Sequence, residues 1–127
     1  MARIVVCEDD PVIMKLLQVA LRDPGYELLT APNGLLGFEL IERERPDAIL
    51  TDVTMPGMSG LELADAVRAR PDLAQIPILF LSASAQRTHL EEGQRHGATA
   101  YVTKPFRAVE LRAALAWALE QSRPDPS

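Results

Sequence analysis

Cysteine is almost absent from this sequence. Cys7 is the single cysteine in 127 residues, so no disulfide can form within the chain. A reducing compartment is the natural setting for such a composition. Because Cys7 lies inside the apolar run 4–7, we interpret it as a small core residue and not as a reactive thiol.

The sequence also lacks an excess of positive charge and any long apolar run. A net charge of −5 argues against nonspecific binding to nucleic acid or to an anionic membrane surface. No apolar stretch approaches the length of a membrane span, and Met1-Ala2-Arg3 leads straight into the first apolar run without a signal peptide. We therefore expect a cytoplasmic protein with no membrane partner and no direct nucleic-acid partner.

What the sequence does contain is a regular alternation of short apolar runs with amphipathic patterns. The length fits one ordinary domain, and 47% apolar with 24% charged residues is typical of a globular chain. Alternation of this kind predicts an α/β fold, with one parallel sheet covered by helices on both faces. The expected strands are 4–7, 26–31 (near an edge), 48–51, 78–81 and 100–103. The expected helices are one from Pro11 to a stop at Pro24-Gly25, then 35–45, 61–69, 90–96 and 108–121. In the first of them, one apolar face is predicted by the helical spacing of Ile13, Leu16, Leu17, Ala20 and Leu21.

Charged and hydroxyl side chains follow four of these strands. They are Glu8-Asp9-Asp10 after the first, Asp52 after the third, Ser82 after the fourth and Lys104 after the fifth. Each alone is most simply a turn residue, a helix cap or solvated surface. Their coincidence at one rim of a parallel sheet, where ligands bind, argues for a shared site.

The acids in this set need a cation nearby. Two carboxylates about 4 Å apart oppose each other by roughly 4 kcal/mol at an effective dielectric constant near 20. Oxygen-only ligands suit a hard ion such as Mg²⁺, which commonly accompanies phosphate, and Mn²⁺ is an alternative.

Four stretches of the chain, residues 4–11, 48–63, 78–83 and 97–106, together resemble the receiver domain of bacterial two-component response regulators. The resemblance covers residues 3–121, and we expect 122–127 to form a disordered tail. It implies a flavodoxin-like, doubly wound sheet of five parallel strands in the order 2-1-3-4-5 with five helices. It also implies a signalling domain that is not an enzyme but assists its own phosphorylation and dephosphorylation.

The resemblance carries a role for each residue of the shared site. It implies that Asp52 accepts a phosphoryl group from a histidine kinase or a phosphotransfer protein. Metal ligands would come from Glu8, Asp9, Asp52 and the main-chain carbonyl of Thr54. The residues that bind the phosphoryl group and switch the domain would be Ser82, Ala83, Tyr101 and Lys104, with a cis bond before Pro105.

Several residues have two readings from sequence. Asp10 can cap the first helix or bind metal, and we favour the cap. His89 and His96 invite a relay or metal interpretation, but we favour ordinary surface histidines. Thr54 and Ser84 occupy the two positions that tune dephosphorylation in the family, and neither would orient water well, which favours a long-lived phosphoryl state.

A partner surface is predicted on the last helix. Trp117 falls nearly opposite the stripe formed by Ala108, Leu111, Leu115, Ala118 and Leu119. It is either an exposed aromatic without a role or a contact with an effector or a second copy. Leu35, Leu36 and Leu40 give a weaker hint of the same kind on the second helix.

Two other functions remain open at this stage. One is a receiver-like interaction module that is never phosphorylated. The other is a phosphatase with an aspartyl nucleophile. That family has its nucleophile after the first strand and a second Asp two residues later, but this chain has Pro11 two residues after Asp9. The chain has no effector domain, so we expect it to act alone or to belong to a longer protein.

Overall fold

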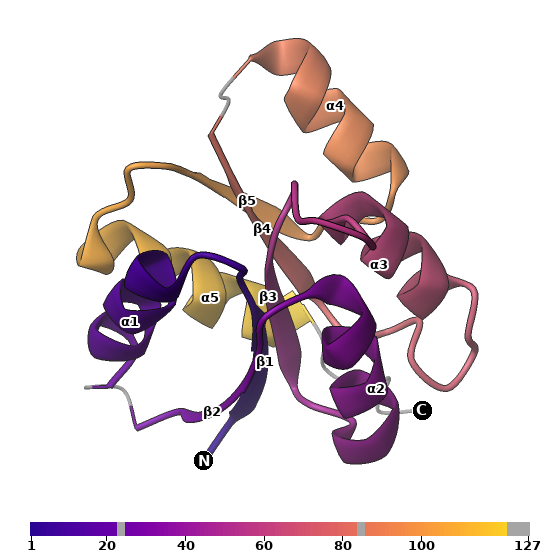
Figure 1. The fold of residues 1–127 in the computed structure, drawn as a ribbon, viewed down its shortest axis with the longest axis horizontal. Helices are drawn as coiled ribbons and strands as arrows, with labels where there is room; N and C mark the ends of the chain where they lie inside the picture. The colour runs from indigo at the N-terminus through magenta and orange to yellow at the C-terminus, as the bar shows by residue number, and fades with distance from the viewer. Residues whose placement is uncertain (23–24, 84–85, 122–127) are drawn as a thin grey trace.

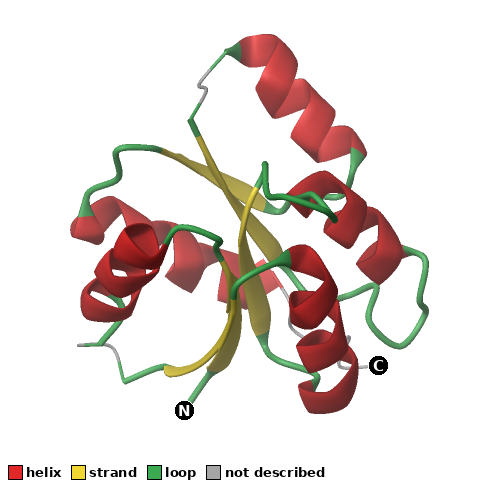
Figure 2. Cartoon of the chain, in the orientation of Figure 1, coloured by secondary structure: helices red, strands yellow, loops and turns green. Residues whose placement is uncertain are grey.

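Five parallel strands form the central layer of the protein in the computed structural model, which describes residues 1–22, 25–83 and 86–121 (Figures 1 and 2). Their order across the sheet is β2-β1-β3-β4-β5, which confirms the predicted topology with β2 at one edge. The predicted tail, 122–127, lies outside the described residues. The strands are β1 (Arg3–Cys7), β2 (Glu27–Ala31), β3 (Ala48–Asp52), β4 (Ile78–Ser82) and β5 (Ala100–Thr103).

Helices alternate with the strands and cover both faces of the sheet. Figure 1 shows α1 and α5 on one face and α2, α3 and α4 on the other. Within the described residues, no helix has both the length and the apolar character needed to cross a membrane. The helices are α1 (Pro11–Ala20), α2 (Gly34–Glu44), α3 (Gly60–Arg68), α4 (Arg87–Arg95) and α5 (Ala108–Gln121).

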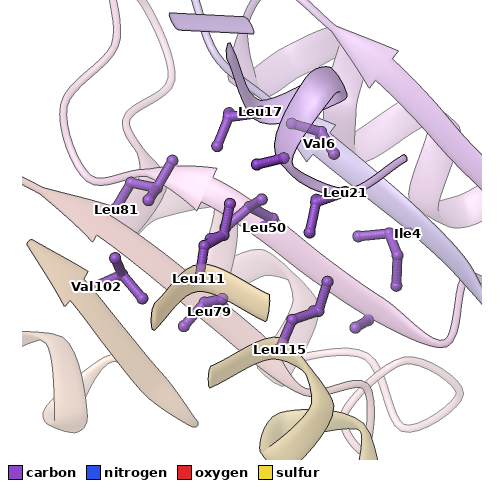
Figure 3. Packing of buried hydrophobic residues seen from close by; sticks show 12 residues of the cluster. Ile4, Val6, Leu17, Leu21, Leu50, Leu79, Leu81, Val102, Leu111 and Leu115 are labelled. Atoms are coloured by element: carbon purple, nitrogen blue, oxygen red, sulfur yellow. The ribbon is translucent and has the colours of Figure 1, made fainter. Parts of the chain in front are cut away.

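The alternating side chains of the strands build two apolar cores. Val6 and Leu50 point toward α1 and α5, where Figure 3 shows them packed near Leu17 and Leu111. Their neighbours along the strands point to the opposite face and pack against α2 and α3. Cys7 belongs to this second core, and burial raises the pKa of its thiol to about 12, as expected of an inert core residue.

One prediction about the cores was wrong. The helical spacing in α1 placed Leu16 in the buried stripe with Leu17, but Leu16 is 53% exposed. The buried side chains of α1 are Leu17 and Ala20, because only a narrow strip of this helix faces the sheet and α5. Leu16 instead lines an open apolar groove beside Phe106 and Ala108.

Side-chain caps fix where α1 and α3 begin, and so position the loops that precede them. The Asp10 carboxylate accepts hydrogen bonds from the backbone N–H groups of Val12 and Ile13, at 2.8 and 3.4 Å, which confirms its role as the cap of α1. Ser59 and Glu62 form a reciprocal capping box at the start of α3. These caps hold the β1–α1 and β3–α3 loops over the carboxyl end of the sheet.

Arg68, at the end of α3, ties together two loops that the sequence does not connect. Its Nε and Nη2 donate to the carbonyl oxygen of Gly97 at 3.1 and 2.7 Å. Its Nη1 donates to the carbonyl oxygens of Ala74 and Ile76 at 2.8 and 2.7 Å. Arg68 therefore links the loop before β4 to the loop before β5.

We expect Arg68→Met to lower the free energy of unfolding by about 2–4 kcal/mol, because partly buried carbonyl groups lose their donor. Arg70→Met is the matched control, since the ion pairs of Arg70 with Glu42 and Asp72 are on the surface. That control should cost less than about 1 kcal/mol. Urea denaturation measures both, and equal losses would contradict the structural role of Arg68.

Candidate functional site

Three acidic side chains meet at the carboxyl end of the sheet. Glu8 and Asp9 follow β1 and Asp52 ends β3, and these strands are neighbours with Cys7 in register with Thr51. One oxygen from each acid lies within 4.8 Å of the others. Glu8 and Asp52 are only 2% and 8% exposed, whereas Asp9 is exposed. This all-oxygen cluster fits a hard divalent cation.

Lys104 closes the site from the direction of β5. Its Nζ donates to Oδ2 of Asp52 at 2.8 Å and to Oε2 of Glu8 at 3.5 Å. The backbone N–H of Lys104 donates to the carbonyl oxygen of Ser82 at 2.8 Å, which holds the two strand ends together. The peptide bond between Lys104 and Pro105 is cis.

The electrostatics of the site reflect crowding of acids in a buried place. Burial raises the pKa of Glu8 to about 7, and the nearby charge of Asp52 adds to the effect. The hydrogen bond of 3.0 Å that Glu8 accepts from the backbone N–H of Asp10 acts in the opposite direction. The pKa of Lys104 is raised: burial opposes this shift, but the hydrogen bond to Asp52 and the two acidic charges outweigh it.

An open pocket of about 480 Å³ lies beside these groups. Six of the residues predicted for the site line it: Asp52, Thr54, Ser82, Ala83, Tyr101 and Lys104. The structure therefore brings together, in one place, side chains from β3, β4 and β5 and from the loops that follow them. Trp117 is apart from them, 50% exposed on α5.

The far wall of this pocket was not anticipated. His89 and Glu92 of α4 line it, with Ser59 and Leu61 from the start of α3. No spacing in the sequence indicates that residues of the polar helix α4 line the same pocket as Asp52. The other histidine, His96, has its Nδ1 2.7 Å from Oδ1 of Asp65 on α3. Ser84 lies outside the described residues.

Comparison with known proteins places this fold and site in one family. The family model described as "Response regulator receiver domain" matches residues 4–116. The chain therefore belongs to the response regulator receiver domains of two-component systems, as the sequence motifs predicted.

Individual relatives agree with this assignment. PilH of Pseudomonas aeruginosa is 35% identical over 105 residues, which cover 83% of this chain and 87% of PilH. The transcriptional regulatory protein CseB of Streptomyces coelicolor is 39% identical over 104 residues, covering 82% of this chain but only 43% of CseB. The chain thus spans less than half the length of that regulator.

A solved structure is similar over nearly the whole chain. It is the receiver domain of the sensor histidine kinase PA1611 from Pseudomonas aeruginosa PAO1, described as having a magnesium ion coordinated in its active-site cleft. It has a TM-score of 0.86 and 30% identity, and it covers 94% of this chain and 98% of the other.

The raised pKa of Glu8 predicts how stability depends on pH in the absence of a divalent cation. The folded protein holds a proton on Glu8 up to a pKa of about 7, whereas the ordinary value is 4.5. The unfolded chain therefore binds fewer protons between these values, and the free energy of unfolding falls as pH rises through this window. Urea denaturation in a chelating buffer at about pH 5 and about pH 8 measures the fall.

Glu8→Gln is the control for this prediction, because it keeps the shape of the side chain and removes its titration. The variant should lose less stability than the parent protein over the same pH range. Identical pH profiles for the two proteins would contradict the assignment of the raised pKa to Glu8.

Proposed function

We propose that this chain accepts a phosphoryl group on Asp52 from a histidine kinase or a phosphotransfer protein, and that this modification controls binding of a partner. The observation that carries the proposal is the contact of 2.8 Å between Nζ of Lys104 and Oδ2 of Asp52, two residues that line the pocket. Carboxylate oxygens of Glu8 and Asp9 lie within 4.8 Å of one of Asp52. Membership of the receiver family supports the same reaction.

In the proposed reaction, a carboxylate oxygen of Asp52 attacks the donor phosphorus in line with the bond that breaks. When the donor is a phosphohistidine, the P–N bond breaks, its electron pair stays on the imidazole, and an acyl phosphate forms on Asp52. Lys104 starts in contact with Asp52 and would donate to a phosphoryl oxygen as charge develops there. Ala83 has a small side chain in the pocket wall and leaves room for the donor.

The acids of the site would hold Mg²⁺ or Mn²⁺. The proposed ligands are Glu8, Asp9, Asp52 and the main-chain carbonyl of Thr54, and the ion would supply positive charge in addition to that of Lys104. The similar receiver domain of PA1611, described with magnesium in its cleft, supports this choice of ion. Because Glu8 must be ionised to bind a cation well, added Mg²⁺ should stabilise the protein more at about pH 8 than at about pH 5.

The proposed response begins at Ser82. Its hydroxyl, at the end of β4 in the pocket wall, would donate to the phosphoryl group and draw the following loop inward. Tyr101 would then move, and the surface formed by α4, β5 and α5 would change. Trp117 and Val109, 50% and 64% exposed on α5, would provide apolar contacts for an effector or a second copy of the chain.

We place this protein in the cytoplasm, where its kinase or phosphotransfer partner would reach it. The net charge of −5 supports a protein partner over direct contact with nucleic acid for this part of the molecule. A regulator such as CseB has further sequence beyond the matched region, so any DNA contact in a related protein would belong to that part.

The proposed phosphoryl group on Asp52 would be long-lived. Thr54, which lines the pocket, has neither an acid nor an amide group that would orient an attacking water molecule well.

Intact-mass measurement after incubation with acetyl phosphate and Mg²⁺ tests the proposal against its two alternatives. We expect one stable adduct with the mass of a single phosphoryl group. Hydrolysis of acetyl phosphate without an adduct would favour an aspartyl phosphatase. No reaction with acetyl phosphate or with a phosphorylated histidine donor would favour a module that is never phosphorylated.

A further inference from the structure

Gly93 of α4 lies against the ring of Tyr101 on β5. Among the residues of α4 whose burial is described, Gly93 is the buried one, and the others are partly or fully exposed. A Cβ atom at position 93 would overlap with Oη, Cε2 and Cζ of Tyr101. Atoms that are not bonded to one another do not approach so closely, so the ring of Tyr101 occupies the space that a side chain at position 93 would need.

Tyr101, on β5, lies between α4 and the pocket beside Asp52. Its hydroxyl donates to the carbonyl oxygen of His89, in the first turns of α4, at 3.0 Å. Its ring packs edge to face on Phe80 of β4, with the centroids 5.6 Å apart. The same ring lines the pocket together with Asp52 and Lys104. One side chain therefore contacts both the helix and the phosphorylation pocket.

The carboxyl-terminal end of α4 is held in a different way. His96 is paired with Asp65 of α3 at 2.7 Å, and the next residue, Gly97, accepts two hydrogen bonds from Arg68. These contacts do not involve Tyr101. A movement of Tyr101 would therefore change its contacts with Gly93 and His89, whereas the contacts of His96 and Gly97 with α3 do not depend on it.

We propose that Gly93 is a positioning residue that lets α4 dock on Tyr101, and that it thereby couples the pocket at Asp52 to the position of α4. The inference rests on the proposed function, in which phosphorylation of Asp52 moves Tyr101. The inference adds a reason why α4 would respond to phosphorylation. Because residue 93 has no side chain, the ring of Tyr101 packs directly on α4, and a displacement of the ring would change the position of the helix.

A double-mutant cycle tests the contact itself. Alanine is favoured over glycine within a helix by a factor of about five in the folding equilibrium constant, when nothing else changes. We expect Gly93→Ala to destabilise the parent protein, because of the overlap with Tyr101, and to stabilise the Tyr101→Ala protein, where the overlap is gone. Gln94→Ala, on the exposed side of α4, should have the same effect in both backgrounds.

Denaturation in urea gives the free energy of unfolding of the parent, the two single variants and the double variant. The effect of Gly93→Ala on this free energy can change sign between the two backgrounds even if some variants are less stable than the parent. Additive effects, with Gly93→Ala having the same sign in both backgrounds, would overturn the proposed contact.

A spectroscopic measurement tests the coupling. Tyr26 and Tyr101 are the two tyrosines, so fluorotyrosine incorporated into a Tyr26→Phe protein reports on Tyr101 alone by fluorine NMR. In that protein, beryllium trifluoride with Mg²⁺, a mimic of the phosphoryl group, should move the Tyr101 resonance. With Gly93→Ala added, the resonance should already be displaced without the mimic, and the response to the mimic should be largely lost.

The rate of adduct formation with acetyl phosphate shows whether Gly93→Ala damages the phosphorylation site itself. We expect the Gly93→Ala protein to form the adduct at a rate within a few-fold of the parent. A normal Tyr101 response in the Gly93→Ala protein would overturn the coupling. If the Tyr26→Phe protein forms no adduct and shows no response, the proposed function fails and the coupling with it, whereas the stability cycle still reports on the contact.

Discussion

Asp52→Asn should leave the protein without any phosphoryl adduct after incubation with acetyl phosphate and Mg²⁺. The amide oxygen is a poor nucleophile, and it can form neither the acyl phosphate nor a strong bond to a divalent cation. Asp52 lies 2.8 Å from Nζ of Lys104, closer than Glu8 at 3.5 Å, and it lines the pocket, so we expect no other carboxylate to replace it. The expected loss is complete within the sensitivity of intact-mass measurement.

The Asp52→Asn variant should stay folded, and a control substitution of equal charge change is available. The substitution preserves volume, and it removes one acid from a crowded cluster, so the metal-free protein should remain folded. Glu39→Gln is a matched control because it removes one negative charge from an exposed position on α2. The control should form the adduct at the rate of the parent. An adduct of equal yield in the Asp52→Asn protein would show that another residue accepts the phosphoryl group.

Lys104→Met should slow adduct formation by a factor of about 10²–10³, the usual cost of losing one group that stabilises charge in a transition state. The reaction remains chemically possible, because Asp52 and the acidic cluster are intact. The slow adduct should also fail to produce the Tyr101 response, since Lys104 links Asp52 to the strand that carries Tyr101. The adduct is followed by intact mass over time, and the response by the fluorotyrosine signal.

The chain offers a control of the same kind. Lys15, exposed on α1, is the other lysine, and Lys15→Met changes the net charge equally. It should leave the rate within about twofold of the parent, because surface charges at a distance are screened by salt. An equal loss of rate in both variants would mean that net charge, and not the contact with Asp52, explains the effect of Lys104.

Much of the fold was predictable because the sequence pattern and the local chemistry point the same way. Five apolar runs became five strands, and the acids and Lys104 after those runs were brought to one rim by the parallel arrangement itself. Asp10 was predictable as a cap because Pro11 opens a helix immediately after it. In each case the determining interaction lies within a few residues or follows from strand direction.

Features that depend on packing between distant segments were not predictable. Helical spacing identifies an apolar sector but not the width of the strip that a neighbouring layer covers, which is why Leu16 proved to be exposed. Arg68 looks like an ordinary residue at the end of a helix, yet it binds carbonyl groups of two loops. Likewise, nothing in the sequence shows that Gly93 lies on the ring of Tyr101, because that contact needs the register between α4 and β5.

The position of the modification tests the central claim most directly. Borohydride reduces an acyl phosphate on aspartate to homoserine, so treatment of the phosphorylated protein, followed by digestion and peptide mass spectrometry, locates the acceptor. With Mg²⁺ present, we predict homoserine at position 52 and none when the divalent cation is chelated. Homoserine at Asp9 or elsewhere, or labelling of position 52 that is independent of the cation, would contradict a phosphoryl site built from the acidic cluster and Lys104.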